Sequence, residues 1–358
     1  MMASIDAVLK PSQSPSGGAL KKSASLVLRL AIGVGILAYL TKSGQINLSS
    51  LAGLYHAWPI SIMAVGILLL DIVLMSFRAS LLFSSASLTL SVWNSLQLNL
   101  IGFLFSTFLP GAAGGDIAKV YYATKENHGR RAEVTTVLIL DRLVGLFSLV
   151  LLPLLFAPFF PALLGSVPVL RRLLWMDALL AAAMLAGAAL MMFFSPTRSW
   201  ISLLLGKWPS IRNLALRVVD AMAAQGKARG KLFIALLLSL LANMALIVVT
   251  ALGFTVVNPG LFSGNLVLVA PLGHLVNSLP LTPGGIGVGE TAFNTLFSLA
   301  KMSGGAETLL CLRIWNLAVG ALGLLVYLFG MGRIVRPYED EPAEARSSGL
   351  RVESLSKP

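Results

Sequence analysis

Apolar stretches of about 18 or more residues recur along the chain, and they constrain its fold more than any other feature. At about 1.5 Å per residue, a helix of that length crosses the roughly 30 Å hydrocarbon core of a membrane. Only 12% of the residues are charged, whereas a soluble domain carries roughly a quarter. The sequence therefore predicts an all-α polytopic membrane protein.

About six complete transmembrane helices are expected, each mostly apolar and bounded by polar or proline-containing connections. They cover residues 25–41, 58–77, 134–156, 173–195, 232–256 and 308–332.

These spans belong to one transmembrane domain over residues 25–336. A polar cytoplasmic tail is expected at 1–24. A second tail is expected at 337–358, where too few apolar residues occur for it to fold alone. Residues 207–231 carry apolar side chains at helical spacing, which predicts an amphipathic helix on the membrane surface or, alternatively, a linker helix packed on the protein.

The net charge of +12 follows the orientation rule of membrane proteins and does not indicate nucleic-acid binding. Most of the 27 Lys and Arg residues fall in tails and connections that one topology places on the same side, Arg78 after the second span among them. This bias predicts that both termini are cytoplasmic. The single Cys311 excludes an intrachain disulfide, and the three histidines lack metal-ligand spacing, so no cofactor is expected.

Two further apolar regions, 92–118 and 265–300, are interrupted by proline and glycine clusters. The cations between 119 and 131 should be cytoplasmic, which requires the first region to enter and leave on that side. By the same count the second region begins and ends outside. Both are therefore predicted to be re-entrant helical hairpins of opposite orientation.

The two breaks share the pattern L-P-x-x-x-G-G, starting at Leu109 and Leu279. An acidic residue follows each break, Asp116 and Glu290, and an arginine follows in the next span at nearly the same distance. Two copies in opposite orientation predict an inverted repeat. The alternative is that the prolines and glycines merely kink spans for packing.

Proline removes a backbone donor and glycine permits turns closed to other residues, so the helix ends and its amides stay free. Amides freed after Gly115 and Gly285 would suit a phosphate or carboxylate at the membrane midplane. Ionisable groups at that depth mark function by default. The residues expected to line the transport pathway are Pro110, Gly114, Gly115, Asp116, Asp141, Arg142, Asn277, Pro283, Gly284, Gly285, Gly287, Glu290 and Arg313.

A structural ion pair is the alternative for these charges, with Asp116 or Glu290 paired to Arg142 or Arg313. His274, beside the second break, is expected to be a polar packing residue and not a base. No catalytic residue is assigned, because no constellation typical of an enzyme occurs.

Three groups of residues resemble one known family. They are Phe108-Leu109-Pro110 through Gly114-Gly115-Asp116 with Tyr121-Tyr122, then Asp141-Arg142 with Gly145-Leu146, and Pro283-Gly284-Gly285-Ile286-Gly287 through Glu290. Over about residues 25–335 the chain is similar to the transmembrane region of lysylphosphatidylglycerol synthases, whose members are often called flippase-like.

The resemblance implies a lipid flippase that moves a phospholipid or other polar-headed lipid across a bacterial cytoplasmic (inner) membrane. Members that synthesise lysyl-lipid carry a soluble aminoacyl-transferase domain that this sequence lacks, so synthase activity is not expected. The expected partners are the lipid bilayer, its lipid substrate, and lipid-synthesis enzymes or a second copy of the chain in a homo-oligomer.

Two other function classes stay open. One is a membrane-embedded enzyme acting on a lipid-linked substrate, with Asp116 and Glu126 as candidate acid and base. The other is a non-catalytic membrane partner of a synthase.

Overall fold

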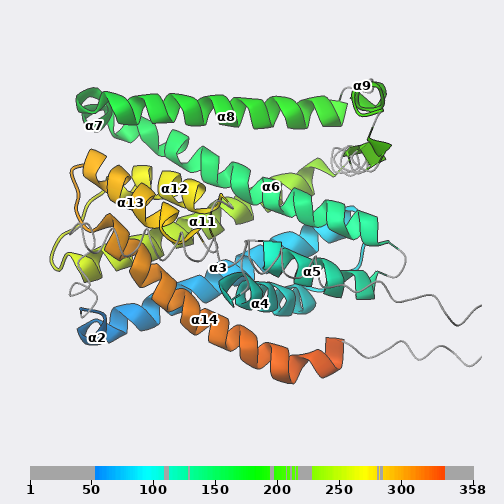
Figure 1. Cartoon of the computed structure of the whole chain (residues 1–358), viewed down its shortest axis with the longest axis horizontal. Helices are drawn as coiled ribbons and strands as arrows, with labels where there is room; N and C mark the ends of the chain where they lie inside the picture. Colours follow the sequence, from blue (N-terminus) through cyan, green and yellow to red (C-terminus); the bar gives the residue numbers. More distant parts are fainter. Residues whose placement is uncertain are drawn as a thin grey trace, which may run out of the picture.

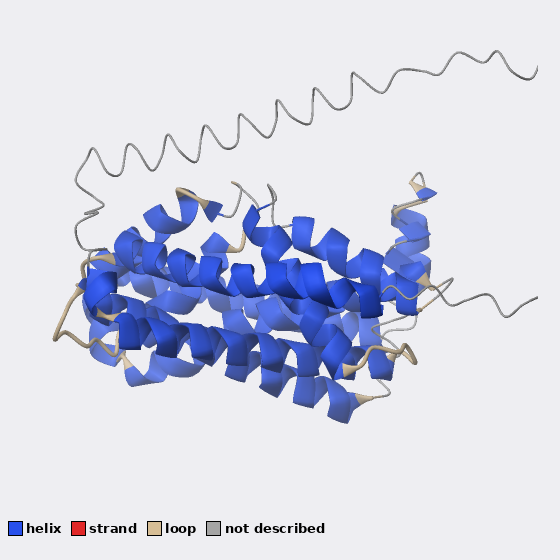
Figure 2. Cartoon of the chain, turned by 90° about the horizontal axis from the view of Figure 1, so that it is seen from below, coloured by secondary structure: helices blue, strands red, loops and turns tan. Residues whose placement is uncertain are grey.

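The structure is a computed structural model in which all regular elements of the described residues are helices, as expected. Figure 2 shows the long helices side by side along the long axis of the molecule. The expected span 25–41, both tails and most of segment 207–231 lie outside the described residues. The structure describes residues 53–108, 113–127, 130–193, 197–206, 208–209, 212–213, 215–216, 228–279, 282 and 285–334.

Five helices in the described part of the chain are long and apolar enough to cross a membrane. Each overlaps one of the spans expected there, because an apolar run of about 20 residues is stable in lipid only with its backbone hydrogen-bonded internally, as in a helix. They are α3 (Trp58–Ser85), α6 (Arg131–Phe156), α8 (Pro168–Phe193), α11 (Arg229–Val257) and α14 (Gly305–Ile334).

Helix α3 continues beyond the expected end of its span at residue 77 and reaches Ser85. Arg78 therefore lies inside a long apolar helix, where it is 3% exposed, and not in a connection. The placement of Arg78 in the cytoplasmic connection was wrong. An arginine is tolerated at such a position only when other groups neutralise it.

The two regions with proline and glycine breaks form two pairs of shorter helices. In the first, α4 (Val92–Phe108) packs against α5 (Ala113–Glu126). In the second, α12 (Leu266–Asn277) packs against α13 (Val288–Leu299).

The two pairs lie in opposite halves of the molecule (Figure 1). Helices α12 and α13 lie towards the end that holds α2 (Gly53–His56) and α7 (Pro161–Ser166), which follows the short helix η2 (Ala157–Phe159). Helices α4 and α5 lie towards the other end of the long axis, the end at which α8 leads to α9 (Thr197–Leu204).

The contacts between long and short helices follow a reciprocal pattern. Helix α6, which follows the first pair, packs on α12 of the second pair. Helix α14, which follows the second pair, packs on α4 of the first. Helices α3 and α11, which precede the two pairs, pack against each other. The helices of each half of the chain therefore pack on those of the other half.

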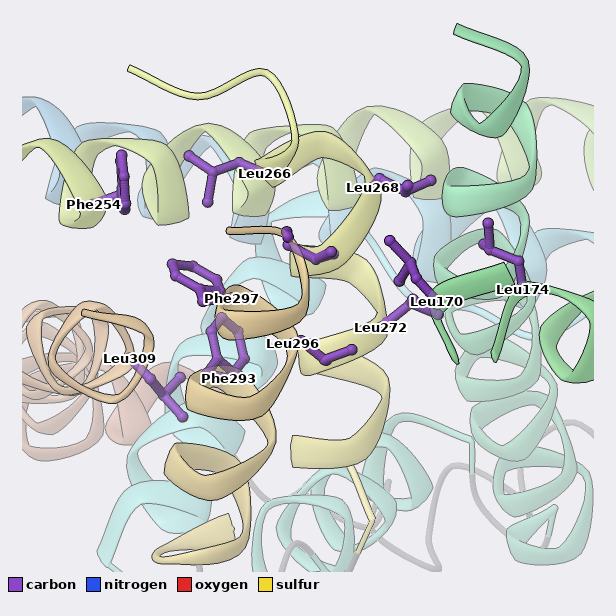
Figure 3. Close-up of a cluster of buried hydrophobic side chains, with 12 residues drawn as sticks. Leu170, Leu174, Phe254, Leu266, Leu268, Leu272, Phe293, Leu296, Phe297 and Leu309 are labelled. Atoms are coloured by element: carbon purple, nitrogen blue, oxygen red, sulfur yellow. The ribbon is translucent and has the colours of Figure 1, made fainter. Parts of the chain in front are cut away.

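An apolar cluster holds the second pair in place (Figure 3). Phe293 and Phe297 of α13 contact the leucines of α12, and Phe254 of α11 and Leu309 of α14 cover them. Leu170 and Leu174 bring the first turns of α8 into the same cluster. The pair α12–α13 is thereby held against three long helices, α8, α11 and α14.

Candidate functional site

Glu290 lies in the first turn of α13 with its side chain fully buried. Its Oε2 accepts a hydrogen bond from the backbone amide of Gly287 at 2.7 Å. Its Oε1 accepts a hydrogen bond from Nε of Arg313 on α14 at 2.6 Å. A carboxylate in this position has its charge neutralised by the arginine and also satisfies the hydrogen-bonding need of a backbone amide at the helix start. Of the ion pairs considered from the sequence, Glu290 with Arg313 is thus present.

Asn277, the last residue of α12, completes this network. Its Oδ1 accepts a hydrogen bond from Nη2 of Arg313 at 3.3 Å. The chain passes so close to Asn277 that a Cβ on Gly285 or Gly289 would lie 2.4 or 2.2 Å from the same oxygen. Gly285 and Gly287 also have φ angles of 69° and 84°, in the left-handed region that favours glycine.

These contacts change the role expected for the second break. The helix begins at Val288, after Gly285, and the Gly287 amide is bonded to the chain's own carboxylate and not left free. Glu290 occupies the position where an external anion was expected. The accessible charge is the Arg313 guanidinium, whose side chain is 24% exposed while that of Glu290 is fully buried. Arg313 is therefore the member of the network that can contact an anionic ligand.

Asp141 on α6 belongs to a second buried network. Its two carboxylate oxygens accept hydrogen bonds from Nε and Nη2 of Arg78 at 2.7 and 2.9 Å. Nη1 of Arg78 donates to Oγ of Ser239 on α11 at 2.9 Å. A Cβ on Gly145 would lie 2.9 Å from Nη1 of Arg78, so this glycine makes room for the guanidinium. The network ties three long helices together.

Arg142 follows Asp141 directly but has an exposed side chain. Successive helical residues point about 100° apart, so only one of the two can face the interior here. The repeat predicted from the sequence pairs Arg142 with Arg313, yet the two occupy different environments. Arg313 pairs with the buried Glu290, whereas in the first half the buried ion pair is formed by Asp141, the neighbour of Arg142, with Arg78.

The first break is less fully described than the second. Pro110, Pro283 and Gly284 lie outside the described residues, and the side chain of Asp116 is not described. Helix α5 begins at Ala113, so Gly114 and Gly115 lie within its first turn, whereas the sequence was expected to place the helix after Gly115. Gly102 of α4 approaches the carbonyl oxygen of Gly115, which a Cβ on Gly102 would meet at 3.3 Å. Small residues thus allow close packing of α4 on α5.

His274 is a packing residue, as expected. Its Nε2 lies 2.8 Å from Oγ1 of Thr250 on α11, and its ring meets that of Phe293 edge to face at 5.0 Å.

A groove of about 850 Å³ lies between α8 and the pair α12–α13, and we call it the α8 groove. Its wall is almost entirely apolar, and it reaches Gly287, whose amide is bonded to Glu290. A second groove of about 500 Å³ lies between α6, α8 and α11, with Arg229 at its wall. Helix α8 borders both grooves.

Three interior residues were missed by the sequence reasoning: Arg78, Ser239 and Asp177. Arg78 was assigned to a connection, although an acid such as Asp141 in a membrane helix calls for a cationic partner. Asp177 lies inside an expected span, and the rule that intramembrane ionisable residues are functional would have singled it out. Ser239 carries no such signal, because serine is common in membrane helices.

Among the described residues, no group of three His, Cys, Asp or Glu side chains could hold a metal ion.

Comparison with known proteins gives one family. The model of the family described as "Lysylphosphatidylglycerol synthase TM region" matches residues 26–326. No curated protein and no solved structure matches the chain.

Proposed function

Because this chain belongs to the lysylphosphatidylglycerol synthase TM region family, we propose that it carries a polar-headed phospholipid between the two leaflets of a membrane. The chain is a multi-pass membrane protein of a lipid-related family. The proposal places it in a bacterial cytoplasmic membrane with both termini in the cytoplasm.

The observation that carries the proposal is the network of Glu290, Arg313 and Asn277 at the turn between α12 and α13. Charged groups inside an apolar bundle cost several kcal/mol unless they are paired, so they are retained where they serve a function. Arg313 is only partly enclosed and presents a planar donor suited to a phosphate. A phospholipid head group supplies that phosphate.

The α8 groove suits the rest of the same molecule. It is apolar along most of its wall and ends at Gly287, next to the buried Glu290. Acyl chains gain nothing by leaving lipid for such a wall, but they also lose nothing, so a lipid can slide in without a large cost. The head group would enter the polar interior while the chains stay in the groove.

The arrangement of the two helix pairs supports an alternating pathway. The pairs lie in opposite halves of the molecule, and α6 and α14 exchange contacts with the first helix of the other pair (Figure 1). We propose that the pairs are re-entrant hairpins from opposite leaflets in an inverted repeat. In such folds, rocking of one repeat against the other exposes a central site to each side in turn.

Reconstitution tests this function directly. Purified protein is placed in liposomes that contain a fluorescent phosphatidylglycerol, and an impermeant reductant bleaches the label in the outer leaflet. The protein is expected to bring inner-leaflet label to the reductant faster than empty liposomes do. Equal rates with and without protein would refute the proposal.

The same vesicles test the alternative of an enzyme. Extracted lipids are separated by mass, and transport predicts that the labelled lipid is chemically unchanged. Glu126, one of the acids considered for catalysis, accepts a hydrogen bond from Nδ2 of Asn94 at 2.5 Å and thereby links α4 to α5.

A further inference from the structure

Asp177 is a buried acid of α8 that neither network uses. The residue is 4% exposed, and it lies at the wall of the α8 groove. Both carboxylate oxygens are buried, and neither has a hydrogen-bond partner among the described residues. Buried polar atoms are nearly always paired, and an unpaired acid in a membrane helix is rarer still.

The groove around Asp177 supplies no counter-charge. Asp177 is the only titratable residue among those that line it in the described structure. Thr291 and Thr295 lie at the same wall, but their hydroxyls donate to the carbonyl oxygens of Gly287 and Thr291, each at 2.8 Å. These hydroxyl groups therefore donate within their own helix segment and not to Asp177.

Titratable groups on the neighbouring helices are engaged elsewhere. His274 of α12 contacts Thr250, and Glu290 of α13 pairs with Arg313. On α6, Asp141 pairs with Arg78, and the side chain of Arg142 is exposed. On α8 itself, Arg171 and Arg172 lie one to two turns earlier with exposed side chains.

We infer that Asp177 binds a proton that is exchanged during the transport cycle, so that the proton gradient drives lipid movement. This inference rests on the proposed function. The two buried oxygens can bind a proton, whereas a metal ion needs several oxygen ligands and an ammonium group several acceptors, and the largely apolar wall supplies few of either. The protonated acid is neutral and is compatible with the apolar wall.

Helix α8 is suited to open and close this groove. It is the least buried of the five long helices, with 17% of its most apolar window buried against 44% for α6. When α8 moves away from α12 and α13, water reaches Asp177, the O–H bond breaks, and the proton passes to that water while the carboxylate keeps the electron pair and becomes negatively charged. Uptake of a proton reverses the step and allows α8 to close.

The first test reads the proton itself. Infrared spectra of the full chain in lipid nanodiscs are recorded for the wild type and for Asp177→Asn. The difference is expected to contain a carboxylic-acid C=O band at neutral pH that shifts on exchange into D2O. If the difference contains only carboxylate bands, the proton site is refuted.

The second test reads coupling. Liposomes with fluorescent phosphatidylglycerol are given an inward or outward pH gradient. Wild-type lipid movement is expected to change at least several-fold between the two directions, and Asp177→Asn is expected to lose that difference. Glu133→Gln, which removes an exposed carboxyl at the start of α6 outside the groove, should keep it.

The outcomes separate the two claims. Lipid movement that ignores the gradient, or a gradient response that survives in Asp177→Asn, overturns proton coupling and leaves lipid transport standing. A protonated band without any lipid movement overturns transport, and coupling with it, and leaves Asp177 as a proton site. Unfolding of Asp177→Asn is checked with Asp177→Glu, which should restore both the band and the response.

Discussion

Arg78 of α3 and Asp141 of α6 form a buried bidentate ion pair, with N–O distances of 2.7 and 2.9 Å. The planar guanidinium matches the two carboxylate oxygens. Its remaining nitrogen, Nη1, donates a hydrogen bond to Oγ of Ser239. The pair brings two charges into an apolar bundle as a neutral unit. It therefore links α3, α6 and α11 without leaving an uncompensated charge in the interior.

Arg78→Leu should destabilise the protein by about 3–5 kcal/mol, because it leaves the Asp141 carboxylate buried without a partner. The double variant Arg78→Leu with Asp141→Leu should recover most of this loss, since no charge remains. Denaturant unfolding in mixed micelles, followed by circular dichroism, measures both. A double variant no more stable than the single one would contradict the pairing.

Glu290→Gln should slow lipid movement by about tenfold or more, because an amide caps Gly287 but cannot neutralise Arg313. Leaflet-resolved fluorescence in liposomes measures the rate, and gel filtration checks the fold. The control is Glu133→Gln at the exposed start of α6, which should move lipid at the wild-type rate. Equal rates for the two variants would remove Glu290 from the pathway.

Gly289→Ala should destabilise the second helix pair by about 1–3 kcal/mol, since the added methyl group would lie 2.2 Å from Oδ1 of Asn277. Gly66→Ala is the matched control. Gly66 lies in α3 with no atom near its Cβ position, and alanine favours a helix there. The melting temperatures should fall for the first and not for the second. A melting temperature of Gly289→Ala as high as that of Gly66→Ala would indicate that the turn tolerates a side chain.

Arg131→Cys and Ser303→Cys should react with an impermeant thiol reagent from opposite sides of the membrane. The first lies at the start of α6 and the second before α14, at the ends assigned to opposite leaflets. Cys311→Ala supplies the background, and the native Cys311 is buried. Labelling of both sites from one side would overturn the inverted arrangement of the two helix pairs.

Much of the helical framework could be predicted from local sequence. Apolar length is a property of a continuous segment, so α3, α6, α8, α11 and α14 each overlap an expected span. Helix ends were less predictable. Helix α3 passes residue 77 because Asp141, far away in the chain, neutralises Arg78.

The candidate site was predictable in part. Glu290 and Arg313 stood out as ionisable residues in apolar surroundings, and the structure joins them. The fate of the Gly287 amide could not be predicted, because it depends on the path of the turn around Asn277.

The sequence by itself determined that this chain is a bundle of membrane helices with two broken segments, because lipid leaves the backbone no other way to satisfy long apolar runs. Only the tertiary structure decided which charges meet. Asp141 faces Arg78 while Arg142 next to it is exposed, and Asp177 faces a groove with no partner among the described residues. Such differences arise because packing sets the direction that each helix face takes, and a residue's neighbours in space are seldom its neighbours in the chain.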